Sequence, residues 1–150
     1  MKWEFIDSRG DGGNTSIMTN ENTATDNRII IERALSGLIT DGDTATLDRL
    51  LRDDFVHHRP DRSRTKAEWL AALLALPLED LRVELQHVLA DGDRVAVISR
   101  RRLEGGGPGI TGMDLWRLED GLVVEGWEII EPEGDAPANF AWWQPSGSSI

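Results

Sequence analysis

The spacing of apolar residues changes once along this chain, near Pro77, and that change constrains the fold more than any other feature. Before Pro77, apolar residues recur three and four positions apart, as on one face of a helix. After Pro77, they alternate with polar residues, as in strands that bury one face. Helices that precede a run of strands predict an α+β fold with an antiparallel sheet, and not a parallel βαβ sheet.

Three helices are expected in the first half. The first spans Asp26–Ile39 and is broken by the Asp-Gly-Asp sequence at 41–43. The second begins at Thr44 and includes Leu51. The third begins at the capping box Thr-Lys-Ala-Glu of residues 65–68. It is expected to stop before Pro77, because helical backbone angles are disfavoured for the residue that precedes a proline.

Four strands are expected in the second half: Leu81–Leu89, Val95–Arg101, Ile110–Leu118 and Leu122–Ile130. Short segments rich in glycine and aspartate join them, and these favour hairpin turns between neighbours along the chain. A strongly bent sheet that wraps three helices is expected to enclose an apolar pocket, and such pockets bind small molecules. The predicted ligand is therefore a small hydrophobic molecule.

The chain has 150 residues, a formal net charge of −11 and no cysteine. A strongly acidic chain is a poor partner for phosphate backbones, so nucleic-acid binding is not expected. The absence of cysteine favours a reducing, cytoplasmic compartment, and no apolar run is long enough to suggest a membrane span. The expected organisation is a flexible tail over 1–24, a folded domain over 25–132 and a second tail over 133–150.

Three segments resemble the SnoaL-like polyketide cyclases of the nuclear transport factor 2-like superfamily. Residues 55–60 have the sequence Phe-Val-His-His-Arg-Pro. They resemble a motif that follows the second helix in this family: an aromatic residue, any two residues, His, any residue and Pro. Residues 89–97 are similar to the family's hairpin, and residues 112–127 are similar to its last two strands. The likeness covers roughly residues 26–131, and the order and spacing of the segments make it specific.

The resemblance implies a cone-shaped, cystatin-like fold that commonly forms a homodimer through the sheet. It also implies aldol-type cyclisation, double-bond isomerisation or epoxide hydrolysis without cofactor or metal, although some members only bind ligands. The chain departs from the family at three positions: Phe55 stands where Tyr is common, Arg59 where Asn is usual, and Gly126 where His often precedes the Trp.

Asp114 is the leading candidate for catalysis, because a carboxylate in the middle of a strand is normally avoided. The resemblance implies that an Asp at this position is a general acid and base. Burial in an apolar pocket would raise its pKa toward the range useful for abstracting a proton next to a carbonyl. His58 matches the family's histidine beside the pocket and is the second expected catalytic residue, whereas His57 is expected to face solvent.

Six further residues are expected to contact the ligand: Phe55, Trp69, His87, Arg101, Trp116 and Trp127. His87 and Arg101 share the alternation of the apolar residues on their strands, which favours an inward orientation for both. Two alternatives stay open: His87 as a core residue with its hydrogen bonds satisfied, and Arg101 at the margin of the sheet, paired with local acids. The three tryptophans offer wide apolar walls. None of the usual metal-binding histidine spacings occurs, so no metal site is expected.

These features favour a cofactor-independent cyclase or isomerase that transfers a proton on a small hydrophobic carbonyl compound. In this mechanism, Asp114 moves the proton, and His58 or an indole N–H stabilises the oxyanion. Two alternatives stay open: an enzyme of the same fold that hydrolyses or opens an epoxide, and a non-catalytic module for ligand binding or dimerisation. An enzyme should place a second polar group within reach of Asp114, whereas a binding module should surround it with apolar walls alone.

Overall fold

The computed structural model describes residues 15–141, with side chains described from residue 21 onward. Its elements are α1 (Thr15–Asp41), α2 (Thr44–Leu50), β1 (Leu51–His58), β2 (Ser63–Thr65), α3 (Lys66–Leu74), β3 (Leu81–Asp91), β4 (Arg94–Leu103), β5 (Ile110–Glu119), β6 (Leu122–Pro132) and α4 (Ala136–Ala141). None of the described helices is both long and apolar enough to cross a membrane.

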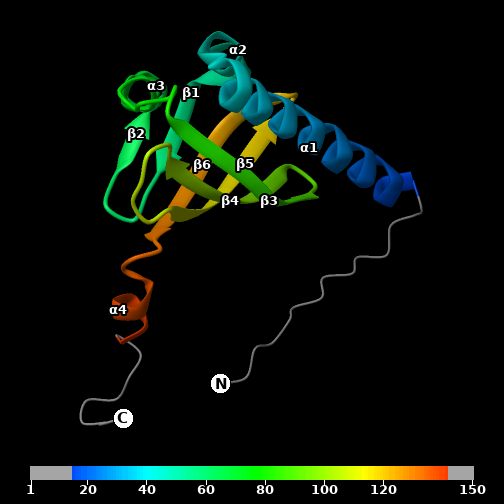
Figure 1. The fold of residues 1–150 in the computed structure, drawn as a ribbon. Helices are drawn as coiled ribbons and strands as arrows, with labels where there is room; N and C mark the ends of the chain where they lie inside the picture. Colours follow the sequence, from blue (N-terminus) through cyan, green and yellow to red (C-terminus); the bar gives the residue numbers. More distant parts are fainter. Residues whose placement is uncertain (1–14, 142–150) are drawn as a thin grey trace.

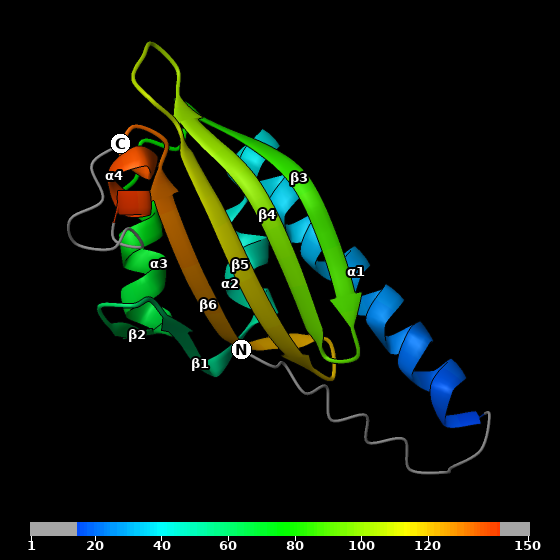
Figure 2. The same ribbon diagram turned by 90° about the horizontal axis from the view of Figure 1, so that it is seen from below.

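The six strands form one curved sheet in the order β2-β1-β6-β5-β4-β3. All neighbouring strands pair antiparallel except β1 and β6, which run parallel. Figure 1 shows α1 lying across the sheet, with α3 beside β1 and β2, and Figure 2 shows β6, β5, β4 and β3 side by side with α1 behind them. The predicted α+β fold, with helices packed on a curved and mostly antiparallel sheet, is confirmed.

The sequence did not predict β1 and β2. Leu51 begins β1 instead of ending the second helix. The segment 51–58 has two adjacent acids and no regular alternation, so its extended state depends on tertiary contacts. It pairs with β6 on one side and with β2 on the other, and it buries Leu51 and Phe55 in the core.

The first helix also begins earlier than predicted, at Thr15 instead of Asp26. Its first part extends beyond the sheet, and residues 21–26 are exposed or only half-buried. A helical segment that packs on no core needs no apolar stripe, so the apolar spacing gave no sign of it. The predicted tails lie outside the described residues at 1–14 and 142–150, and α4 occupies part of the second one.

The core lies between α1 and the inner face of the sheet. Its buried residues are Ile31, Leu51, Phe55, Val95, Val97, Trp116, Leu118 and Val123. Because side chains alternate between the two faces of a strand, Ser99 and Arg101 follow Val97 onto the inner face, and Asp114 precedes Trp116 on it. The strands therefore carry polar groups into the same layer as the apolar core.

Candidate active site

Three neighbouring strands bring charged side chains together on the inner face. Arg101 belongs to β4, Asp114 to β5 and Glu128 to β6. Asp114 and Glu128 stand directly opposite each other in the ladder between β5 and β6. Like charges in such positions repel each other, so this pair needs a cation or a shared proton.

Arg101 supplies that cation. Its Nη2 donates a hydrogen bond to Asp114 Oδ2 at 2.6 Å, and its Nη1 donates to Glu128 Oε2 at 2.7 Å. Its Nε donates to the hydroxyl of Ser99 at 3.1 Å. Gly112 makes this placement possible, because a Cβ atom there would lie only 2.7 Å from Arg101 Nη2. Arg101 therefore points inward and not to the margin of the sheet, and its guanidinium bridges two carboxylates.

His57 completes the cluster from β1, although it was expected to face solvent. Its side chain is 1% exposed, and neither ring nitrogen has a hydrogen-bond partner. The imidazole lies among aromatic rings, with centroids 5.3 Å from that of Trp69 and 6.1 Å from that of Trp116. The expectation was wrong because His57 alternates with Phe55 on the buried face of β1, a strand that the sequence did not predict.

Gly126, which stands where a histidine was expected from the resemblance, makes room for this arrangement. It is the ladder partner of His57 on β6. A Cβ atom at Gly126 would lie 2.7 Å from the ring of Trp116 and 3.3 Å from Cδ2 of His57. A larger residue at position 126 would therefore displace the tryptophan, the histidine or both.

Burial shifts the pKa values of Asp114 and His57 in opposite directions. Desolvation raises the pKa of Asp114 to about 7; Glu128 adds to the rise, and Arg101 opposes it. Desolvation lowers the pKa of His57 to about 4, and nearby arginines act in the same direction, whereas Glu128 opposes the shift. Near pH 7 the carboxyl of Asp114 can therefore both take and give a proton, while His57 is a neutral imidazole.

The cluster also contains a donor set that suits a divalent metal. One nitrogen of His57 and one carboxylate oxygen each from Asp114 and Glu128 lie within 4.8 Å of one another. One histidine and two carboxylates match the preferences of ions such as Zn²⁺ and Mn²⁺. Arg101 already binds one oxygen of each carboxylate, so a metal here would compete with the guanidinium for the same two side chains.

His58 lies on the outer face, away from Asp114. Its Nε2 hydrogen-bonds to Glu125 Oε1 at 2.7 Å, and its Nδ1 hydrogen-bonds to the hydroxyl of Ser63 at 2.8 Å. Its ring stacks on that of Trp127 at a centroid distance of 5.4 Å. The structure therefore brings neither His58 nor Trp127 to the inner cluster.

Three of the expected ligand contacts do meet on the inner face. Phe55 packs against Trp69 at a centroid distance of 5.6 Å, and Trp69 packs against Trp116 at 6.0 Å. His87 does not join them, because it is exposed. The pairing register of β3 shifts between Leu85 and His87, and this extra residue reverses the alternation on which the inward orientation depended.

The sequence reasoning missed Glu128 and His57. A signal for Glu128 was available, because it alternates with Val124 and Gly126, both buried. Glu128 was assigned no role from the sequence. Alternation counted from Val123 would have placed it on the outer face, since the ladder between β5 and β6 also shifts register near Arg117. No comparable signal existed for His57 without knowledge of β1.

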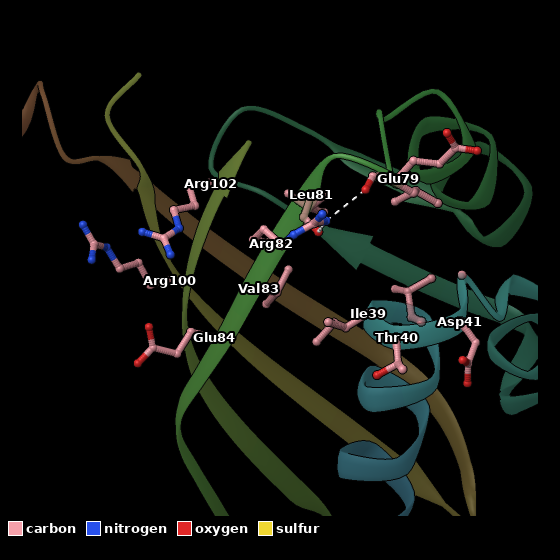
Figure 3. Close-up of a pocket in the computed structure, with 13 residues that line it drawn as sticks. Ile39, Thr40, Asp41, Glu79, Leu81, Arg82, Val83, Glu84, Arg100 and Arg102 are labelled. Carbon is pink, nitrogen blue, oxygen red and sulfur yellow. Dashed lines mark hydrogen bonds between the residues drawn. The ribbon is translucent and has the colours of Figure 1, made fainter. Parts of the chain in front are cut away.

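A separate groove of about 820 Å³ lies where the end of α1 approaches the start of β3. Ile39 of α1 and Val83 of β3 face each other across it (Figure 3). None of Asp114, Glu128 and His57 lines it. Val83 is nevertheless the ladder partner of Arg101, so the groove begins one strand away from the charged cluster.

The fold and the inner cluster define a small α+β domain of the helix-on-curved-sheet type, and the comparisons agree. The family model of the SnoaL-like domain matches residues 31–126. This match covers more than half of the chain, which therefore belongs to the SnoaL-like domain family. Among proteins with curated descriptions, none matches the chain.

Several solved structures share the fold. A structure from Kribbella flavida DSM 17836, whose name proposes a ketosteroid isomerase, has a TM-score of 0.67 and 18% identity and covers 87% of each chain. A protein of unknown function from Burkholderia xenovorans LB400 has a TM-score of 0.65 and 13% identity, over 84% of this chain and 98% of that one. An LEH-like epoxide hydrolase from M. tuberculosis has a TM-score of 0.59 and 19% identity, over 72% and 84%. At these identities the likeness shows a common fold.

Proposed function

We propose that this domain is a cofactor-independent cyclase or isomerase that transfers a proton on a small hydrophobic carbonyl compound. The observation that carries the proposal is the environment of Asp114. Its side chain is only 8% exposed, it is held by Arg101, and its pKa is raised to about 7 by burial. A buried carboxyl that titrates near neutral pH is suited to general acid and base catalysis.

In this mechanism the carboxylate of Asp114 removes a proton from the carbon next to the substrate carbonyl. The C–H bond breaks, and its electron pair moves onto the carbonyl oxygen to form an enolate. An isomerase returns the same proton to a different carbon. In a cyclase the enolate carbon instead attacks a second carbonyl, and the alkoxide that forms on that carbonyl oxygen takes the proton back from Asp114. In both cases Asp114 ends in its starting state, so no cofactor is consumed.

His57 is suited to hold the substrate oxygen. A neutral imidazole carries one N–H, and in this protein both ring nitrogens are buried without a partner. An unpaired buried donor is costly unless a ligand completes it. A substrate oxygen that accepts a hydrogen bond from His57 would gain negative charge in the transition state, where the interaction is strongest. Arg101 acts as a positioning residue that holds Asp114 and Glu128 side by side.

The aromatic rings support a hydrophobic substrate. Phe55, Trp69 and Trp116 pack around His57, so a bound molecule would contact apolar walls on several sides. The charged cluster beside these walls favours an enzyme over a module that only binds. A pure binding site would gain nothing from two carboxylates, whose burial is costly.

A second candidate, the opening of an epoxide by water, is favoured by one specific observation. The nearest ligand atoms of His57, Asp114 and Glu128 lie within 4.8 Å of one another, so a single water molecule bound by one of them would be within reach of the others. Glu128 or Asp114 could take a proton from that water as it attacks the epoxide carbon. The other carboxyl could protonate the leaving oxygen.

Proton exchange in D₂O tests the first proposal without knowledge of the natural substrate. We expect the protein to speed the exchange of the protons next to the carbonyl of β-tetralone, measured by NMR. The rate should rise with pH through an apparent pKa near 7, as the Asp114 carboxylate forms. Asp114→Asn should lower the rate by roughly 10²- to 10⁴-fold, which is typical for loss of a general base.

Asp91→Asn is the matched control, because Asp91 is exposed at the end of β3 and should leave the rate unchanged. An Asp114→Asn variant that exchanges the protons as fast as the wild type would remove Asp114 from the mechanism. Hydrolysis of styrene oxide, with no exchange of β-tetralone, would favour the second candidate.

A further inference from the structure

Four buried side-chain nitrogens have no hydrogen-bond partner within the residues that the structure describes. They are both ring nitrogens of His57, Nε of Arg59 and Nε1 of Trp116. Most buried polar atoms in native proteins are paired, so an unpaired donor gains most from a ligand that supplies an acceptor. Nε1 of Trp116 lies on the edge of the indole opposite to Cε3 and Cζ3, which face Gly126, so it points away from β6. The proposed mechanism pairs His57 with the substrate carbonyl but leaves Nε of Arg59 unpaired.

A tight turn fixes the position of Arg59 at the end of β1. The backbone N–H of Arg59 donates to the carbonyl of Arg62 at 2.8 Å, and that of Arg62 donates to the carbonyl of Arg59 at 3.3 Å. Pro60 and Asp61 are thus the two central residues of a hairpin turn between β1 and β2. Arg59 follows His57 by two residues, and alternation places both side chains on the inner face.

Glu128 links Arg59 to the inner cluster. Its Oε1 lies 3.5 Å from Nη1 of Arg59, and one of its oxygens lies within 4.8 Å of a ring nitrogen of His57. On the other side, Nε of Arg59 lies 3.9 Å from Oδ1 of Asp61. Neither contact is a hydrogen bond, and both carboxylates are hydrogen-bonded to other arginines. The side chain of Arg59 is 31% exposed and donates no hydrogen bond to any described residue, although its Nε is buried.

The charges around His57 and Arg59 already balance. The cations are Arg59, Arg62, Arg64 and Arg101, and the acids are Asp61, Glu68, Asp114 and Glu128. An anionic group beside Arg59 would bring a further negative charge close to Asp61 and Glu128, and these carboxylates would repel it. A neutral oxygen accepts the same hydrogen bond from Nε without that repulsion. The unpaired Nε therefore favours a neutral acceptor such as a carbonyl oxygen.

We propose that Nε of Arg59 donates a hydrogen bond to a second, neutral carbonyl oxygen of the substrate, so that Arg59 determines which carbonyl compounds the site takes. This inference rests on the proposed function, which places the reacting carbonyl oxygen at His57. The two residues are two positions apart on one face, so the two oxygens are separated by about 7 Å, the rise of two strand residues. The substrate class is then a hydrophobic compound with carbonyl groups at opposite ends. The oxygens of a 1,3-dicarbonyl lie too close together to reach both donors.

Three substituted β-tetralones test this inference. The first, 7-acetyl-β-tetralone, carries a second carbonyl oxygen across the ring system from the first one. The second, 7-isopropyl-β-tetralone, has nearly the same shape without that oxygen, and 7-carboxy-β-tetralone carries a carboxylate there instead. Calorimetric titration of the wild type should show roughly ten-fold tighter binding of the acetyl compound than of the isopropyl compound, as expected for a hydrogen bond from a charged donor. The carboxy compound should bind more weakly than the acetyl compound.

Arg59→Met removes Nε and keeps an apolar stem, so it should bind the acetyl and isopropyl compounds equally. It should bind the isopropyl compound as tightly as the wild type does, and this binding shows that the variant is folded. Arg62→Met is the matched control, because the side chain of Arg62 lies in the same turn but is 61% exposed and pairs with Asp61. It should keep the preference of the wild type.

NMR of the wild type gives a second reading that requires no turnover. In proton–nitrogen spectra, the Nε–H signal of Arg59 should move downfield when the acetyl compound binds and should stay in place when the isopropyl compound binds. A failure of the proposed function would leave this result intact, because it would appear in the proton exchange of Asp114→Asn and not in binding at Arg59.

Equal binding of the acetyl and isopropyl compounds to the wild type, no binding of either, or a preference that Arg59→Met retains would overturn the inference. An Nε–H signal that the acetyl compound leaves unmoved would also overturn it, because a bound water would then be the lasting partner of this donor. Tighter binding of the carboxy compound than of the acetyl compound would overturn it in favour of an anionic substrate.

Discussion

At the scale of single residues, the same apolar surroundings act on Asp114 and His57 and keep both uncharged over a wide pH range. Desolvation raises the pKa of the carboxyl to about 7 and lowers that of the imidazole to about 4. Between these values each side chain is mainly neutral. Arg101 binds Glu128 as well as Asp114, and Arg59 lies 3.5 Å from the other oxygen of Glu128.

These two shifts predict opposite dependences of stability on pH. The folded state keeps a proton on Asp114 that the unfolded state releases, so this contribution to the free energy of unfolding falls as pH rises from about 4 to about 7. The contribution of His57 to the free energy of unfolding is complete above the ordinary histidine pKa of 6.5 and is lost as pH falls toward 4. Over the range from about 4 to 6.5, the two contributions partly cancel.

Urea unfolding at several pH values separates them. Asp114→Asn should be more stable than the wild type by about 2–4 kcal/mol at pH 8, and the difference should shrink toward pH 4. His57→Leu should instead become more stable relative to the wild type as the pH falls to 4, because it removes a buried ring that resists protonation. If Asp114→Asn and the wild type show the same pH dependence, Asp114 does not titrate as described.

At the scale of elements, α3 is the helix least secured by burial near the site. None of its residues is fully buried, and it packs mainly against β1 and β2, with Trp69 reaching Trp116 of β5. Its start is held by a capping box, in which the hydroxyl of Thr65 accepts from the backbone N–H of Glu68 while the Glu68 carboxylate accepts from that of Thr65. Because Trp69 belongs to this helix, access to the rings around His57 depends on how firmly α3 is held.

Removing the cap should therefore loosen α3 and the packing of Trp69 over His57. Thr65→Ala should cost about 1 kcal/mol of local stability, which corresponds to about five-fold faster hydrogen exchange of the α3 amides. Thr25→Ala, on the exposed part of α1, should leave exchange in α3 unchanged. Unchanged exchange in Thr65→Ala would show that packing of Trp69, and not the cap, holds the helix.

At the scale of the whole molecule, the outer face of the sheet carries an apolar band over β4, β5 and β6. Ile98, Met113 and Ile129 are successive ladder partners across these strands, and Leu115 and Trp127 form a second row beside them. Met113 is 50% exposed and Ile129 is 60% exposed. An exposed apolar band of this kind is typical of a surface that another protein covers.

We propose that a second copy of the chain covers this band, so that the protein is a homodimer. Sedimentation velocity at micromolar concentration should give the mass of two chains, and Met113→Glu with Ile129→Glu should give the mass of one. Leu74→Glu is the control, because Leu74 is equally exposed but lies on α3. A wild-type protein that sediments as a monomer would contradict the homodimer.

The sequence by itself determined the fold class, the four strands of the second half and the inward orientation of Asp114, Arg101 and Trp116. These features depend on local patterns: the apolar period distinguishes helix from strand, and alternation assigns a residue to a face once its strand is known. The proline and the glycine-rich turns mark where one pattern ends and the next begins.

Only the tertiary structure decided which histidine joins the site and what surrounds Asp114. His57 replaces His58 there because β1 pairs in parallel with β6, and this contact joins segments about seventy residues apart, such as Leu51 and Val123. The register shifts in β3 and β6 moved His87 outward and Glu128 inward, since one extra residue sends every later side chain to the other face. Alternation within one strand carries no information about its partner strand or about such shifts, and both arise from contacts that form only when the sheet closes around the helices.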